Sequence, residues 1–185
     1  MNNLLTTEQL EVRMRPGQYS QGGFLGLNES LEAVISKDKR TLEKLGVTYD
    51  QIANSLEKII TEVREQEKVL PFNERKERQT IFPDLYHPEQ NPVFSKDNLP
   101  QLNKGYVVDW FQVFILQYRG FQDCPWDDCD YEGSFDFMIL NRNTGESFMA
   151  PALIVHLIRA HHFFEGVESP YRVDPEKVVR TLELS

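Results

Sequence analysis

Residues 124–162 read CPWDDCDYEGSFDFMILNRNTGESFMAPALIVHLIRAHH, and this stretch decides how we expect the second half of the chain to fold. Ser134–Leu140 is rich in apolar and aromatic residues and is typical of a strand, and Glu146–Met149 is typical of its returning partner. The residues between them, Asn-Arg-Asn-Thr-Gly, favour a turn, so we expect a β-hairpin. Pro151 suits the first position of a helix that continues over Ala152–Phe164. The stretch therefore predicts two strands followed by a helix.

Two cysteines precede this hairpin, and histidines follow it on the helix. Zinc in proteins takes about four nitrogen or sulfur ligands in a tetrahedron. Cys124 and Cys129 can bind from a tight loop, and three of the chain's four histidines fall within seven residues of the helix. On an ideal helix His156 and His161 point about 140° apart, so we expect the helix to tighten or unwind near its end. The sequence predicts a Zn²⁺ site formed by Cys124, Cys129, His156 and either His161 or His162.

At the level of its ligands, the segment from Cys124 to His162 resembles a Cys2His2 zinc finger, over about a fifth of the chain. The gap from Cys129 to His156 is much longer than the roughly 12 residues of the family signature. The helix is also largely apolar, without the basic surface of a DNA reader. The resemblance therefore implies a zinc-finger-like ββα unit that binds metal, and it does not imply nucleic-acid recognition.

Three interpretations of the Cys and His residues remain open from the sequence. Four protein ligands would close the coordination sphere, which is the structural pattern and suits a protein-interaction or regulatory module. A zinc-dependent hydrolase would keep one position open for water, with Glu165 or an aspartate as general base. In a metal-free α+β domain, the same residues would fill the core. We assign no catalytic residue and favour a protein that is not an enzyme. Four aspartates near the cysteines are either hydrogen-bond acceptors for a ligand histidine or solvated loop residues: Asp123, Asp127, Asp128 and Asp130.

Upstream of the cysteines, residues 106–118 are dense in β-branched and aromatic residues and predict one buried strand. A helix is the competing prediction, because so apolar a run shows no clear period of two. Residues 71–105 contain five prolines, which disfavour long helices and central strands. We expect a long Pro-rich connection there, with a short strand near Thr80–Phe82.

The N-terminal third predicts two helices after an irregular arm over residues 1–27. Asn28 or Ser30 can cap the first helix, and Gly46 can end it. Thr48 with Gln51 forms a capping box for the second. Because the connection is short, we expect an antiparallel helical hairpin, whose apolar face is a candidate surface for a protein partner or a homodimer. The predicted class is α+β.

We divide the chain into an arm and helical hairpin (1–70), the Pro-rich connection (71–105) and the α+β zinc-binding unit (106–185), as separate parts or as one domain. The formal net charge is −9, and an acidic protein repels phosphate backbones, which argues against nucleic-acid binding. No apolar run is long enough for a membrane span, and no secretory signal is evident. Two cysteines do not suggest a disulfide scaffold. We therefore expect an acidic, cytoplasmic protein.

Overall fold

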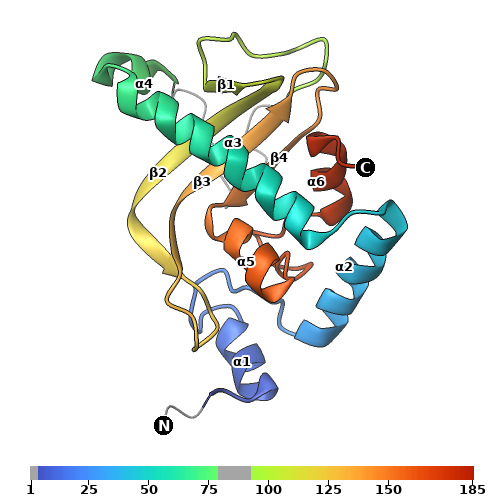
Figure 1. Cartoon of the computed structure of the whole chain (residues 1–185). Helices are drawn as coiled ribbons and strands as arrows, with labels where there is room; N and C mark the ends of the chain where they lie inside the picture. Colours follow the sequence, from blue (N-terminus) through green and yellow to red (C-terminus); the bar gives the residue numbers. More distant parts are fainter. Residues whose placement is uncertain (1–3, 79–92) are drawn as a thin grey trace.

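The computed structural model describes residues 4–78 and 93–185, and it confirms a mixture of helices with an antiparallel sheet (Figure 1). Within these residues the sheet has the order β1-β2-β3-β4. Its strands are β1 (Tyr106–Val108), β2 (Phe111–Asp123), β3 (Glu132–Asn141) and β4 (Ser147–Pro151). The helices of the described ranges are α1 (Thr7–Met14), α2 (Leu31–Leu45), α3 (Tyr49–Val69), α4 (Phe72–Arg78), α5 (Leu153–His161) and α6 (Pro175–Leu182). None of these helices is long and apolar enough to cross a membrane.

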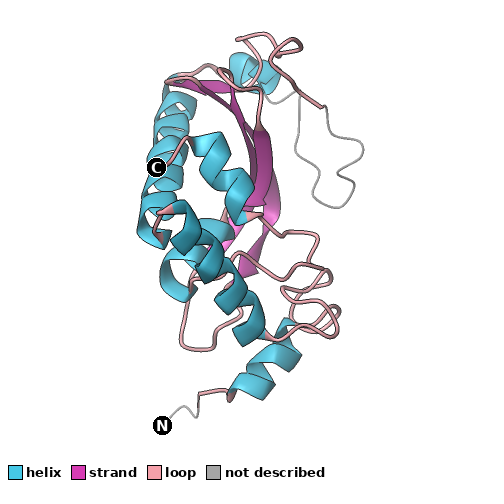
Figure 2. Cartoon of the chain, turned by 90° about the vertical axis from the view of Figure 1, so that its right-hand side faces the viewer, coloured by secondary structure: helices cyan, strands magenta, loops and turns pink. Residues whose placement is uncertain are grey.

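The first part of β2 and the second part of β3 are buried on both faces, which explains why their sequences are apolar without a clear alternation. Successive side chains of a strand point to opposite faces. On β3, Phe137 and Ile139 belong to the main core, whereas Met138 and Leu140 belong to a smaller cluster with Phe94. Helices α3, α5 and α6 contact the strands or one another, and they lie on one side of the sheet (Figure 2).

The predicted single strand over residues 106–118 is wrong, because this stretch holds two strands. Val108 pairs with Phe111, so Asp109 and Trp110 form a two-residue turn between β1 and β2. Asp109 has a φ of 52°, a left-handed conformation that aspartate tolerates better than most residues. The turn therefore forms without the glycine that usually marks it. Strand β2 then runs on to Asp123, beyond the predicted end.

The local capping signals of α2 and α3 are confirmed. The Ser30 side chain accepts a hydrogen bond at the start of α2, and Gly46 ends that helix with a φ of 69°. Thr48 and Gln51 form the predicted capping box of α3. The arm is less irregular than expected, because Thr6 forms a further capping box, with Gln9, that starts α1.

The expected helical hairpin is not confirmed. Helix α2 packs mainly on α6, whereas α3 packs on α5 and β1, and the two helices diverge from their short connection (Figure 1). An apolar stripe indicates that a helix is buried, but it does not identify the partner. Helix α4 lies in the Pro-rich connection, and the strand expected near Thr80–Phe82 falls outside the described residues.

The predicted hairpin of residues 134–149 is present as β3 and β4, but a separate finger-like ββα unit is not confirmed. The two strands belong to the larger sheet. Pro151 ends β4 rather than starting the helix, and the Ala152 N–H donates to the Phe135 carbonyl at 2.8 Å. Helix α5 ends at His161, because His162 takes a left-handed conformation. The first difference follows from this backbone hydrogen bond, which extends the sheet ladder by one residue, and the second follows from the left-handed helix end at His162.

Candidate metal centre

The two cysteines lie in the connection between β2 and β3. Cys124 directly follows β2, and its N–H donates to the Tyr131 carbonyl at 2.8 Å, which closes the connection into a loop. The Cys124 side chain is buried and that of Cys129 is half-buried, and both are free thiols. The sheet thus presents two sulfur atoms from one short loop that is closed at its base.

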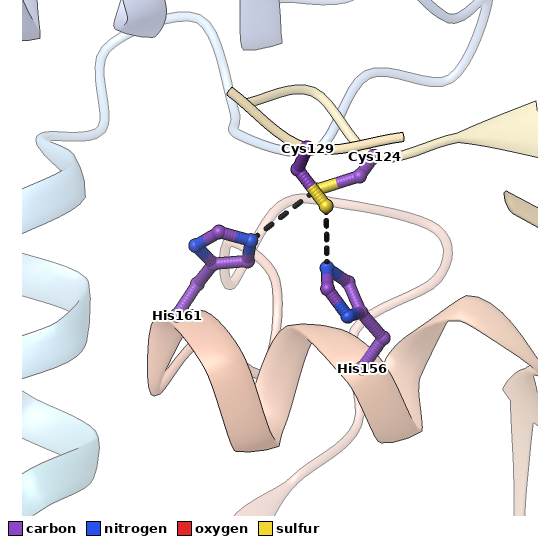
Figure 3. Close-up of side chains that lie close together, drawn as sticks. All are labelled: Cys124, Cys129, His156 and His161. Atoms are coloured by element: carbon purple, nitrogen blue, oxygen red, sulfur yellow. Dashed lines mark hydrogen bonds between the residues drawn. The ribbon is translucent and has the colours of Figure 1, made fainter. Parts of the chain in front are cut away.

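The two histidines reach this loop from α5. Cys124 Sγ lies 3.3 Å from His161 Nε2, and Cys129 Sγ lies 3.0 Å from His156 Nε2. All four donor atoms lie within 4.8 Å of one another, and both rings project from the helix toward the sulfurs (Figure 3). The helix does not need the unwinding that we expected, because it remains α-helical through His161. The side chains themselves bridge the angle between the two positions.

His162 does not join this cluster. It is the first residue after α5, with a φ of 54°, and it is exposed. Its ring stacks on Tyr49 with centroids 4.2 Å apart. The left-handed backbone at the helix end therefore turns His162 toward α3, while His161 faces the cysteines. The sequence left this choice open because it depends on where the helix ends.

An aromatic ring stacks on each histidine of the cluster, and the sequence did not predict these contacts. Trp126 lies 3.8 Å from His161 between ring centroids, at 7° to its plane. Tyr131 lies 4.3 Å from His156, at 6°. Both aromatic residues come from the loop that carries the two cysteines. This loop therefore contacts the imidazoles through stacked rings as well as through the cysteine sulfur atoms. The tryptophan between the two closely spaced cysteines was the feature of the sequence that could have indicated this stacking.

Two of the aspartates near the cysteines hold the N-terminal segment. Asp127 Oδ2 accepts a hydrogen bond from the Leu5 N–H at 2.8 Å, and Asp123 Oδ2 accepts one from the Tyr19 hydroxyl at 3.4 Å. Asp128 and Asp130 are exposed. The acidic loop therefore connects the N-terminal segment to the cluster.

The protonation states of the cluster disfavour nucleophilic chemistry and leave both imidazoles able to bind a metal. Burial lowers the pKa of His161 to about 4, with a smaller effect from His156, and burial also lowers the pKa of His156. Both imidazoles are thus neutral near pH 7 and can offer a lone pair. Without a cation, burial raises the pKa of Cys124 to about 12. A thiolate–imidazolium pair, which a cysteine nucleophile needs, is therefore disfavoured.

The four donors fit a tetrahedral metal ion. Zn–S bonds of about 2.3 Å and Zn–N bonds of about 2.0 Å imply donor separations of about 3.3–3.8 Å around the ion. The sulfur–nitrogen distances of 3.0 and 3.3 Å and the overall limit of 4.8 Å require only small shifts to reach them. Thiolate and imidazole ligands in this combination suit Zn²⁺.

Glu165, the candidate general base, lies outside the cluster and is 1% exposed. Ser169 Oγ lies 2.6 Å from its Oε2 and 3.1 Å from the Gly23 carbonyl oxygen. A hydroxyl has one proton, so both bonds form when the Glu165 carboxyl is protonated. Burial, together with the nearby charge of Asp136, raises the pKa of Glu165 to about 8. This carboxyl acts as a neutral link between two loops.

This pKa predicts a pH-dependent stability. The folded-state pKa of about 8 lies above the ordinary value of 4.5, so the stabilisation is fully present below pH 4.5 and is lost as the pH rises toward 8. Relative to Glu165→Gln, the wild-type free energy of unfolding should fall by on the order of 1 kcal/mol per pH unit between pH 5 and pH 8. Urea unfolding of both proteins measures this difference, and parallel pH profiles would contradict the prediction.

Neither a protein-family model, nor a curated protein sequence, nor a solved structure shows significant similarity to this chain, so the site must be interpreted from its own geometry.

Proposed function

We propose that this chain is a zinc-binding protein in which Cys124, Cys129, His156 and His161 hold a structural Zn²⁺ ion. The observation that carries the proposal is the convergence of four donor atoms within 4.8 Å, from segments separated by a β-hairpin. A bound ion would tie the β2–β3 loop to α5, at a point where the N-terminal segment also docks through Asp127. The metal would thereby link three parts of the chain.

The number of protein donors supports a structural ion over a catalytic one. A catalytic zinc keeps a position for water or substrate, whereas four protein ligands fill the tetrahedron. A cavity of about 310 Å³ borders the site, but of the four donors only Cys129 lines it. This favours the structural site over the hydrolase that we considered as an alternative.

A closed metal site contributes stability rather than chemistry, so we assign the protein a protein-interaction or regulatory role. Thiolate ligands require reduced cysteines, and both cysteines are free thiols. Reduced cysteines persist in the cytoplasm, where glutathione and thioredoxin keep thiols reduced. These properties support a cytoplasmic protein.

The neighbouring histidines provide a matched test. After dialysis against a weak chelator, wild-type protein and His162→Ala should each retain about one zinc per chain, while His161→Ala should lose it. The reason is that the His161 Nε2 faces Cys124 at 3.3 Å, whereas His162 stacks on Tyr49. Elemental mass spectrometry on protein purified without a metal-binding tag measures the content.

Cys124→Ser serves as a second ligand variant and should lose the metal as His161→Ala does. Equal zinc in His161→Ala and His162→Ala would contradict the proposed ligand set. A wild-type protein that is folded, reduced and free of metal would overturn the proposed function.

A further inference from the structure

A second candidate site lies beside the sheet, in a pocket of about 350 Å³. Its walls come from five separate parts of the chain: the loop around Phe24, the second half of β2, the start of β3, the segment from Pro151 to Leu153, and the segment after α5 that contains Glu165 and Tyr171. The second half of β2 curves away from the rest of the sheet (Figure 1). None of the four donors of the metal cluster lines the pocket. The volume lies within the range of small-molecule sites.

The pocket has apolar walls and an aromatic rim. Phe24, Phe135 and Leu153 line its sides. At the rim, Phe121 is 66% exposed and Tyr118 is 40% exposed. Aromatic faces carry negative electrostatic potential, so they attract cations as well as apolar groups. The rim is thus open to solvent and suited to the flat or aliphatic body of a small molecule.

Two acidic side chains are buried in the wall of this apolar pocket. Asp136 on β3 is 6% exposed, and Glu165 is 1% exposed. The Tyr118 hydroxyl donates to Asp136 Oδ2 at 2.7 Å, which fixes that carboxyl beside the rim. Burying a carboxylate in apolar surroundings is costly unless a partner compensates for the lost water. A positively charged ligand group would provide further compensation.

We propose that this pocket binds a small organic cation, namely an amine with an aromatic or aliphatic body. The ammonium group would pair with Asp136, and the body would lie against the aromatic walls. None of the lining residues is a proposed metal ligand, and the inference does not rest on zinc binding.

Two further observations agree with a ligand of single positive charge. Burial raises the pKa of Glu165 to about 8, so this carboxyl carries a proton near pH 7 and adds no negative charge to the wall. The basic side chain among the lining residues, Arg119, is on the exposed part of β2. The overall net charge of −9 also steers cations toward the protein.

A matched panel of probes tests the charge preference. Phenethylamine, 2-phenylethanol and phenylacetate share an aromatic body and differ in charge, and tryptamine, indole-3-ethanol and indole-3-acetate form a second set. Two-dimensional NMR titration of the full chain near pH 7 should show the amines binding roughly tenfold or more tightly than the alcohols, with no saturable binding of the acids. Shifts should concentrate at residues 118–122 and 133–136.

Variants locate the site. Asp136→Asn should weaken amine binding roughly tenfold, while Glu43→Gln, which removes an equal charge from an exposed position on α2, should not change it. If Asp136→Asn does not fold, Phe121→Ala tests the location instead, because this exposed ring can be removed without opening the core. Amine binding to Phe121→Ala should weaken severalfold. Metal content is measured in every variant and should not change. Equal binding of alcohols and amines, preference for the acids, no binding of either amine, or amine binding unchanged in Phe121→Ala would overturn the proposal.

Discussion

Chelation of the bound metal should lower the free energy of unfolding by about 4 kcal/mol or more. A ligand that binds only the folded state, at about 1,000 times its dissociation constant, stabilises by about that amount. Structural zinc in small domains contributes still more. Thermal or urea unfolding of zinc-loaded protein, with and without a chelator, measures the difference. A Cys124→Ser/Cys129→Ser double variant is the control, because its stability should not respond to the chelator.

The loss of protection should be greatest in the segments that the cluster connects. Hydrogen exchange should accelerate most in residues 124–131 and in α5, and also in residues 5–25, because the N-terminal segment docks on the loop through Asp127 and Asp123. Helix α2 packs mainly on α6 and should respond less. Identical melting with and without the chelator, or equal acceleration in α2, would contradict a clamp between the β2–β3 loop and α5.

The sequence predicted the convergence of the cluster but not its final geometry. Two cysteines before a hairpin and histidines on the next helix placed four donors on elements that must fold together. The choice between His161 and His162 depended on the single residue at which α5 ends. The stacking of Trp126 and Tyr131 depended on the path of the loop. Such details follow from tertiary packing, which spacing rules do not describe.

For the fold as for the cluster, features encoded by neighbouring residues were predictable, and features that depend on long-range contacts were not. The capping box of Thr48 and Gln51 is encoded in four consecutive residues, and it was predictable. The turn at Asp109 was missed because no glycine marks it. The expected hairpin of α2 and α3 is not confirmed, because α2 packs mainly on α6 and α3 packs on α5 and β1. Apolar periodicity predicts which face of a helix is buried. The element that this face packs against depends on the rest of the chain.

One long-range contact left a signal that the sequence interpretation did not use. Asp38 lies four residues from both Val34 and Leu42, so it shares the apolar stripe of α2, and it is 2% exposed. A charged residue on such a stripe requires a buried partner. That partner is Arg172, whose Nη1 and Nη2 lie 2.7 and 2.6 Å from the two carboxylate oxygens. The sequence offered no indication of which cation, 134 residues away, would meet it.

Substitution of Arg172 should therefore be among the most destabilising single changes in the chain. Arg172→Ala leaves the Asp38 carboxylate buried without its bidentate partner, and removing one member of a buried pair typically costs about 3–5 kcal/mol. The guanidinium also donates to the Glu165 carbonyl, so its loss frees the segment that follows α5. Urea unfolding of Arg172→Ala against wild type measures the cost.

The matched control is Arg180→Ala, which removes an exposed ion pair with Glu146 and should cost less than about 1 kcal/mol. An Asp38→Leu/Arg172→Met double variant should recover part of the stability that Arg172→Met alone loses, because an apolar pair leaves no unpaired buried charge. If Arg172→Ala costs no more than Arg180→Ala, the pair does not hold α2 to the C-terminal segment. If the double variant is instead the least stable of the series, the shape of the pair matters more than its charge.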